Sequence, residues 1–291
     1  MNIKAENLCF SYGSEQVLHH INFEISEPKI YGVLGRNGAG KTSLLSLIGS
    51  FREPTSGQLL IDGEPPFENA RIMQNVSFLY NKDFSGETDS PSKIIEDIRW
   101  YRPNFDLEYG KELIKKFHLE GKKGVNKLSK GQQSAFNVVV GLASRTPITI
   151  FDEVYLGMDA PARDLFYKEL LKEQERHPRI ILLSTHLVSE MEYLFDEVLI
   201  IKEGRLLLQE SYDELITRGV TVIGSKEAVD AFAAGKEVLN TEQLGDTRSV
   251  TLYGKLSEED EKYAAELGLS IGPVSLHDLF VQLTKEEQTH A

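Results

Sequence analysis

The sequence contains very little cysteine: Cys9 is the only one among 291 residues. A single cysteine cannot form a disulfide within the chain, which excludes a disulfide-stapled secreted fold and favours a reducing compartment. Cys9 stands in an alternating, strand-like stretch, so we expect it to be a small core residue rather than a reactive thiol. The seven histidines show no spacing typical of metal ligands.

Long apolar runs are also absent. No window approaches the roughly 18 consecutive apolar residues that a membrane-spanning helix requires. The N-terminal stretch MNIKAENLCFSYG has no apolar segment typical of a signal peptide. We therefore expect a chain that is soluble, or that is attached to a membrane only through a partner protein.

Positive charge is scarce, because 32 lysines and arginines face 45 aspartates and glutamates and leave a net charge of −13. A chain this acidic is repelled by the phosphates of nucleic acids, so no nucleic acid partner is expected. The one basic-leaning stretch, at 111–124, favours a solvated helix face.

The order of the periodic segments predicts an α/β fold. Residues 2–12 and 16–25 alternate apolar and polar side chains, which predicts two strands joined by a turn. Short apolar runs at 30–35, 148–153 and 180–185 are typical of buried parallel strands, and helical patterns stand between them. We expect a sheet that is covered by helices on both faces.

Two domains are expected along the chain. Residues 1–217 form the predicted main domain, with a helical subdomain at about 83–146. Weaker patterns at 218–291 predict a small α+β accessory domain that ends in an amphipathic helix at 275–285. The tail TKEEQTHA, residues 284–291, is expected to fray.

The segment GRNGAGKT, residues 35–42, carries the clearest chemical signal. It follows an apolar run and opens a helical pattern, which is the context that a P-loop requires. Its glycines let backbone N–H groups turn toward phosphate oxygens, Lys41 supplies charge for the β- and γ-phosphates, and Thr42 offers a hydroxyl to Mg²⁺. The predicted nucleotide-binding residues are Gly35, Asn37, Gly38, Ala39, Gly40, Lys41, Thr42 and Ser43.

Two buried strands end in groups that suit hydrolysis. Asp152 would hold Mg²⁺, directly or through water, and Glu153 would polarise the attacking water. His186 ends the next buried strand, where it could bond the γ-phosphate and orient that water. Strand-end capping and a structural histidine are the alternatives, and the neighbouring P-loop favours the catalytic interpretation.

The segment LSKGQ, residues 128–132, predicts the start of a helix whose interior is apolar. The unpaired N–H groups of a helix N-terminus suit an anion. The alternative is an ordinary cap, in which Ser129 serves its own helix.

Four groups follow one another in a fixed order along the chain: Lys41, Ser129, Asp152 and His186. In this order they resemble the ATP-binding subunits of ABC transporters, over about residues 1–215. The resemblance implies ATP and Mg²⁺ as cofactors, and a P-loop NTPase core with an antiparallel β subdomain and a helical subdomain. It also implies a second ATP-binding subunit, in a homodimer or heterodimer, because the signature loop of one subunit closes on the γ-phosphate held by the other.

The resemblance assigns roles to further residues. Ser129, Gly131 and Gln132 match the signature loop that acts in trans. Tyr12 resembles the aromatic residue that stacks on adenine, with a strand-end tyrosine as the alternative. Asp159 matches the loop that crosses the dimer, and a helix N-cap is compatible with that role.

The chain departs from the family pattern at three positions. Asn81 stands where glutamine is usual, and its side chain is shorter by one methylene, so we expect a water-bridged role toward Mg²⁺. The residues expected to hold Mg²⁺, directly or through water, are Thr42, Asp152 and Asn81. Val154 replaces the common proline, and Lys130 replaces the common glycine of the signature loop.

A single P-loop, no long coiled-coil insertion and the acidic charge favour the motor subunit of a membrane transporter. Such a subunit would lie on the cytoplasmic face of the membrane, bound to an integral permease. The stretch FDEVYLGMDAPARDLFYKELL is similar to bacterial export ATPases, including Ytr-type transporters and exporters of phenol-soluble modulins. We therefore expect export of peptides or of amphipathic, toxic compounds.

Two other functions stay open: a soluble ATPase acting on nucleic acid or ribosomes, and a regulatory module that holds ATP without hydrolysing it. If the transporter interpretation holds, segment 83–127 resembles the region that docks the permease. Subdomain core is the alternative for each of its large apolar residues, which are Phe84, Ile94, Trp100, Tyr101 and Phe105.

Overall fold

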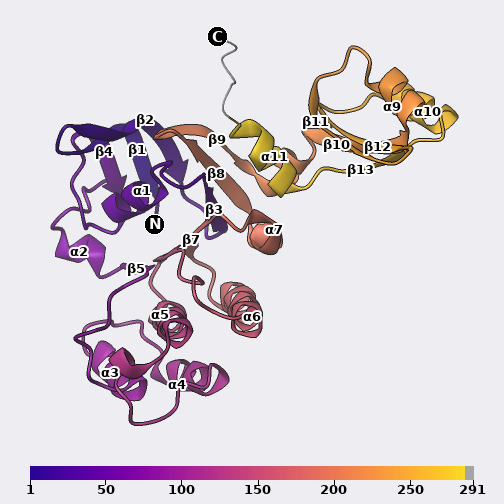
Figure 1. The fold of residues 1–291 in the computed structure, drawn as a ribbon. Helices are drawn as coiled ribbons and strands as arrows, with labels where there is room; N and C mark the ends of the chain where they lie inside the picture. The colour runs from indigo at the N-terminus through magenta and orange to yellow at the C-terminus, as the bar shows by residue number, and fades with distance from the viewer. Residues whose placement is uncertain (286–291) are drawn as a thin grey trace. The chain divides into compact units, whose positions relative to one another are not determined.

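The computed structural model describes residues 1–285, so most of the tail that was expected to fray lies outside the described residues. The chain divides into two compact units (Figure 1). The first comprises Met1–His186 and Tyr193–Gln209, and the second comprises Leu187–Glu192 and the chain from Glu210 onward. Sequence patterns alone place the division at 217/218.

The first unit opens with an antiparallel sheet of three strands. Its order is β2-β1-β4, formed by β2 (Glu15–Ile25), β1 (Ile3–Tyr12) and β4 (Ser56–Ile61). Ile3, Leu8 and Ile21 lie in one core cluster, where none of them is exposed. Strict alternation would put Ile3 and Leu8 on opposite faces, and the register shift between Ala5 and Leu8 lets both face the core.

A six-stranded sheet forms the centre of the first unit, in the order β5-β6-β7-β3-β8-β9. The strands are β3 (Ile30–Leu34), β5 (Val76–Tyr80), β6 (Ile148–Asp152), β7 (Ile180–Thr185), β8 (Glu197–Lys202) and β9 (Arg205–Ser211). β3, β5, β6, β7 and β8 pair in parallel, and every residue of β3, β6 and β7 is buried. The expected α/β class is confirmed. The P-loop, Glu153 and His186 each follow one of these parallel strands, so they meet at one edge of the sheet.

Six helices accompany these sheets: α1 (Lys41–Ile48), α2 (Ala70–Met73), α3 (Pro91–Ile98), α4 (Leu107–Lys116), α5 (Lys130–Ser144) and α6 (Ala160–Arg176). The last four begin at side-chain caps, namely Ser90, Asp106, Ser129 and Asp159. α3 and α4 pack together and α4 packs on α5, which gives the helical part seen in Figure 1.

The second unit contains an antiparallel sheet in the order β11-β12-β10-β13. Its elements are α7 (Val188–Met191), α8 (Tyr212–Ile216), β10 (Gly219–Ser225), α9 (Lys226–Ala233), β11 (Val238–Leu244), β12 (Thr247–Tyr253), α10 (Glu258–Glu266), β13 (Ser270–Pro273) and α11 (Leu276–Leu283). Val222, Phe232 and Leu252 belong to its separate apolar core. Across the described part of both units, no helix combines the length and apolarity needed to cross a bilayer.

Candidate active site

The P-loop presents its backbone to an anion at the start of α1. Gly38 and Gly40 have φ values of 81° and 104°, a left-handed conformation that favours glycine. Gly40 is the N-cap of α1, no side chain caps that helix, and its first turn carries no acidic residue. The N–H groups of this turn are therefore available to phosphate oxygens.

Lys41 lies inside this loop and is only 6% exposed. Its Nζ donates to the carbonyl oxygens of Gly35 and Arg36, at 2.8 and 3.3 Å. Glu153 Oε1 lies 3.9 Å from the same nitrogen. Burial lowers the pKa of Lys41, and the charge of Glu153 opposes that shift. The ammonium is thus held in place by the loop whose phosphate it would contact.

Asp152, at the end of β6, is 5% exposed and bonded on two sides. Ser184 Oγ donates to its Oδ1 at 2.5 Å, and the Thr42 side chain is a second hydrogen-bond partner. Burial raises the pKa of the Asp152 carboxyl, and these two bonds oppose the rise. A carboxylate beside a threonine hydroxyl is an oxygen donor set that fits Mg²⁺.

Ser184 was missed by sequence reasoning. It lies directly opposite Asp152 in the β6–β7 pairing. The signal that could have found it is a hydroxyl residue at the polar end of the run IILLST, on a strand that was otherwise expected to be apolar and buried.

Glu153 and His186 lie next to each other. His186 Nδ1 is 3.0 Å from Glu153 Oε1. Glu153 has φ of 49°, an uncommon conformation for a residue with a side chain, of the kind that clusters at active sites. The structure therefore brings together Lys41, Asp152, Glu153 and His186, which are four of the residues expected from the sequence.

Tyr12 and Asn81 stand beside this centre. Tyr12 ends β1, is 46% exposed, and its hydroxyl lies 3.5 Å from Ser43 Oγ in α1. Asn81 is exposed and follows Tyr80, which pairs with Asp152 across β5 and β6. Both positions are compatible with the roles expected from the sequence.

The signature segment is a capped helix start. Ser129 Oγ accepts from the Gln132 N–H at 3.2 Å, and Gln132 Oε1 accepts from the Ser129 N–H at 3.1 Å, forming a capping box. The self-capping alternative is therefore present in the structure. A Cβ on Gly131 would lie 2.4 Å from the Gly157 oxygen, so this helix start is tightly packed on the loop that follows Glu153.

A groove of about 350 Å³ lies where the helical part adjoins β5. Of the five apolar residues expected at a docking surface, Phe84, Ile94 and Tyr101 line it. Trp100 is 77% exposed, whereas Phe84 and Phe105 are buried, at 6% and 9% exposure, as the core alternative predicts. Phe51 and Phe78 also line the groove and were not anticipated.

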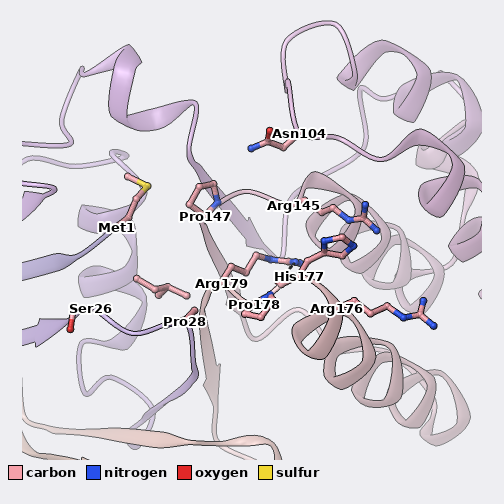
Figure 2. Close-up of a pocket in the computed structure, with 11 residues that line it drawn as sticks. Met1, Ser26, Pro28, Asn104, Arg145, Pro147, Arg176, His177, Pro178 and Arg179 are labelled. Carbon is pink, nitrogen blue, oxygen red and sulfur yellow. Dashed lines mark hydrogen bonds between the residues drawn. The ribbon is translucent and has the colours of Figure 1, made fainter.

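A second cavity, of about 640 Å³, lies among residues that precede β3, β6 and β7, whereas the nucleotide-site residues follow these strands (Figure 2). Arg145 and Arg179 line it. Both guanidinium groups are already bonded to the carboxylate of Glu173, at 2.8 and 3.4 Å. This basic cluster therefore has its counter-charge within the fold.

Comparisons with known proteins agree with this geometry. Residues 18–155 match the family model described as ABC transporter. The bacitracin transport ATP-binding protein BcrA of Bacillus licheniformis is 32% identical over 74% of this chain and 72% of its own length. The ABC transporter ATP-binding protein YtrB of Bacillus subtilis is 24% identical over 96% of this chain and 97% of its own length. The Nod factor export ATP-binding protein I of Cupriavidus metallidurans is 28% identical over 98% of both.

Solved structures show the same fold. The cassette MJ0796, in a dimeric post-hydrolysis state bound to ADP and Pi, superposes with a TM-score of 0.61 at 21% identity. The match covers 72% of this chain and 98% of that one.

Proposed function

Because this chain belongs to the family of ABC transporter ATP-binding proteins, we propose that it is the ATP-hydrolysing motor of an exporter, bound to an integral permease at the cytoplasmic face of a membrane. The observation that carries the proposal is the convergence at one sheet edge of a phosphate-binding loop, a buried carboxylate and the Glu153–His186 pair. ATP hydrolysis itself is the activity of the family.

In this function the P-loop N–H groups and Lys41 bind the β- and γ-phosphates. Glu153 accepts a hydrogen bond from the attacking water, and His186 holds the Glu153 carboxylate through Nδ1. The 3.9 Å separation of Glu153 and Lys41 supports this arrangement, because it places the base next to the phosphate-binding cation.

Thr42 and Asp152 would hold Mg²⁺, with Asn81 contributing through a water molecule. When bound, Mg²⁺ neutralises charge on the phosphate oxygens. The fit rests on Asp152, whose buried carboxylate already has two hydroxyl partners and whose burial disfavours an isolated negative charge.

Cassettes of this family act as dimers with membrane permeases. We place Ser129, Gly131 and Gln132 of each subunit against the γ-phosphate held by the second subunit, so that each reaction centre needs both copies. The support is the α5 N-terminus, which offers N–H groups and a partial positive charge to an anion.

Export is supported by the relatives that match the chain from end to end. Among them is the protein named for Nod factor export, and the match to YtrB likewise includes the second unit. Peptides or amphipathic, toxic compounds are the proposed cargo class. The groove beside β5 is the proposed docking site for the permease, since Phe51 and Tyr101 line it and are 54% and 65% exposed.

The hydrolytic assignment is tested by Glu153→Gln. This variant should bind ATP with ordinary affinity, hydrolyse it at least about a hundredfold more slowly, and form a long-lived ATP-bound dimer. Phosphate release and size-exclusion chromatography with ATP measure these effects. Glu175→Gln is the matched control, because Glu175 is an exposed carboxylate on α6. Turnover at the control's rate would contradict the role of Glu153.

The transporter assignment is tested by co-expression with a candidate permease, a membrane protein with several spans. The chain should sediment with membranes only when that protein is present. Salt-sensitive co-purification with RNA, with no dependence on the membrane protein, would favour the soluble alternative.

A further inference from the structure

The Tyr155 hydroxyl contacts the end of the strand that carries His186. Tyr155 follows Glu153 by two residues and is 1% exposed. Its hydroxyl lies 2.9 Å from Thr185 Oγ1. It accepts from the backbone N–H of His186 at 3.3 Å, and it lies 3.4 Å from His186 Nδ1.

This pattern differs from that of a tyrosine that only fills the core. Phenylalanine would fill nearly the same space, whereas the observed contacts use the oxygen, which offers one donor and acceptor lone pairs. The oxygen contacts the His186 backbone as well as the ring. It therefore acts on the point from which the imidazole projects, while Glu153 contacts only the ring nitrogen.

The sequence position of Tyr155 adds a second consequence. Tyr155 lies on the loop that carries Glu153 in its left-handed conformation. A bond from this loop to the end of β7 joins the water-polarising carboxylate and its histidine partner, which are 33 residues apart in the chain. Preorganised geometry of this kind reduces the rearrangement that the transition state requires.

We propose that Tyr155 is a positioning residue for ATP hydrolysis, whose hydroxyl holds His186 in register with Glu153. This inference rests on the proposed roles of Glu153 and His186. Tyr155 touches neither nucleotide nor water in this role and acts only through His186.

The test is Tyr155→Phe in the full-length chain. We expect kcat to fall about tenfold, while KM for ATP and the affinity for ATP stay within about twofold, because ground-state binding is retained. Tyr31→Phe is the matched control. Tyr31 lies in β3 and is also 1% exposed, and its hydroxyl donates to the backbone oxygen of Glu27, which precedes β3, at 3.1 Å. The control should melt like Tyr155→Phe but keep the wild-type kcat.

A double-mutant cycle with His186→Ala separates positioning from general stability. Since Tyr155 acts through His186, the double variant should be no slower than His186→Ala alone. The proposal would be overturned if the fold losses in kcat of the two single variants multiplied in the double variant. It would also be overturned if Tyr155→Phe had the same kcat as the Tyr31→Phe control.

The cycle also separates this inference from the proposed function. A wild-type kcat in His186→Ala would remove the catalytic role of His186 and this proposal together. A slow His186→Ala enzyme beside a fast Tyr155→Phe enzyme would remove the positioning role alone. If Tyr155→Phe does not fold, Thr185→Val removes the neighbouring hydroxyl from the same cluster, and a smaller kcat loss that vanishes in the His186→Ala background is expected.

Discussion

Removing the charge of Glu173 should destabilise the first unit strongly. Glu173 is on α6 and is 1% exposed. Its Oε1 accepts from Arg145 Nε at 2.8 Å and from Arg179 Nη1 at 3.4 Å. Burial lowers the pKa of Arg179 and the charge of Glu173 opposes it, so the carboxylate is what makes a buried guanidinium tolerable. Both arginines are visible in Figure 2.

The magnitude follows from the partners that remain after Glu173→Gln. Breaking a buried ion pair on one side costs about 3–5 kcal/mol, because it leaves an uncompensated charge. Arg145 keeps Asp106 at 2.7 Å, and Arg179 keeps the oxygens of Thr149 and Leu142. We therefore expect the low end of the range, about 3 kcal/mol. For a unit of this size, that lowers Tm by about 6–12 °C.

Differential scanning calorimetry of the full-length chain measures this shift, with the transition of the first unit followed separately from that of the second. Glu175→Gln removes the same charge from an exposed position of α6 and should leave Tm within about 1 °C. A Glu173→Leu, Arg179→Met double variant should recover part of the loss, since a well-packed apolar pair can replace a buried ion pair. Equal melting of the Glu173→Gln and Glu175→Gln variants would refute the reasoning, as would a double variant less stable than the single one.

Two further predictions concern Gly131, in the first turn of α5, and Glu192, at the end of α7. Gly131→Ala should cut ATP turnover at least about tenfold while the monomer still binds ATP. The added Cβ would lie 2.4 Å from the Gly157 oxygen, so it must displace the N-terminus of α5. Unchanged turnover in a phosphate-release assay would contradict this prediction. Glu192→Ala should destabilise the second unit by about 1–3 kcal/mol, because Glu192 Oε2 accepts from the N–H of buried Leu276 at 2.9 Å and the variant removes that acceptor; an unchanged melting transition of the second unit, measured by calorimetry, would contradict it.

The sequence predicted the elements whose own residues carry the signal. The P-loop was readable because its glycines, lysine and threonine lie within eight consecutive residues, and the buried strands because most of their residues are apolar. β11 and β13 were not predicted. β11 is an edge strand that is mostly exposed and β13 has four residues, so neither shows a periodic pattern, and both depend on neighbouring strands for their hydrogen bonds.

The same limit applies to the site. Lys41, Asp152, Glu153 and His186 were identified because each stands at a strand end or in a motif. Ser184 and Tyr155 were not, because their roles arise from the pairing of β6 with β7. Ser184 meets a carboxylate 32 residues away, and Tyr155 meets a threonine 30 residues away. That pairing, with its register, is a property of the folded sheet, and spacing along the chain does not reveal it.

The cap formed by Ser129 is compatible with the proposed contact between Ser129 and a γ-phosphate. Ser129 Oγ accepts the Gln132 N–H and so caps its own helix. A serine hydroxyl has two acceptor lone pairs and one O–H donor, so this cap uses one lone pair and leaves the donor for a phosphate oxygen. The cap even favours the proposed contact with the γ-phosphate, because it holds the hydroxyl at the helix N-terminus, where an anion is attracted. Ser129→Ala would therefore remove both a cap and a donor, and only a loss of turnover beyond that explained by lower stability would measure the proposed contact with the γ-phosphate.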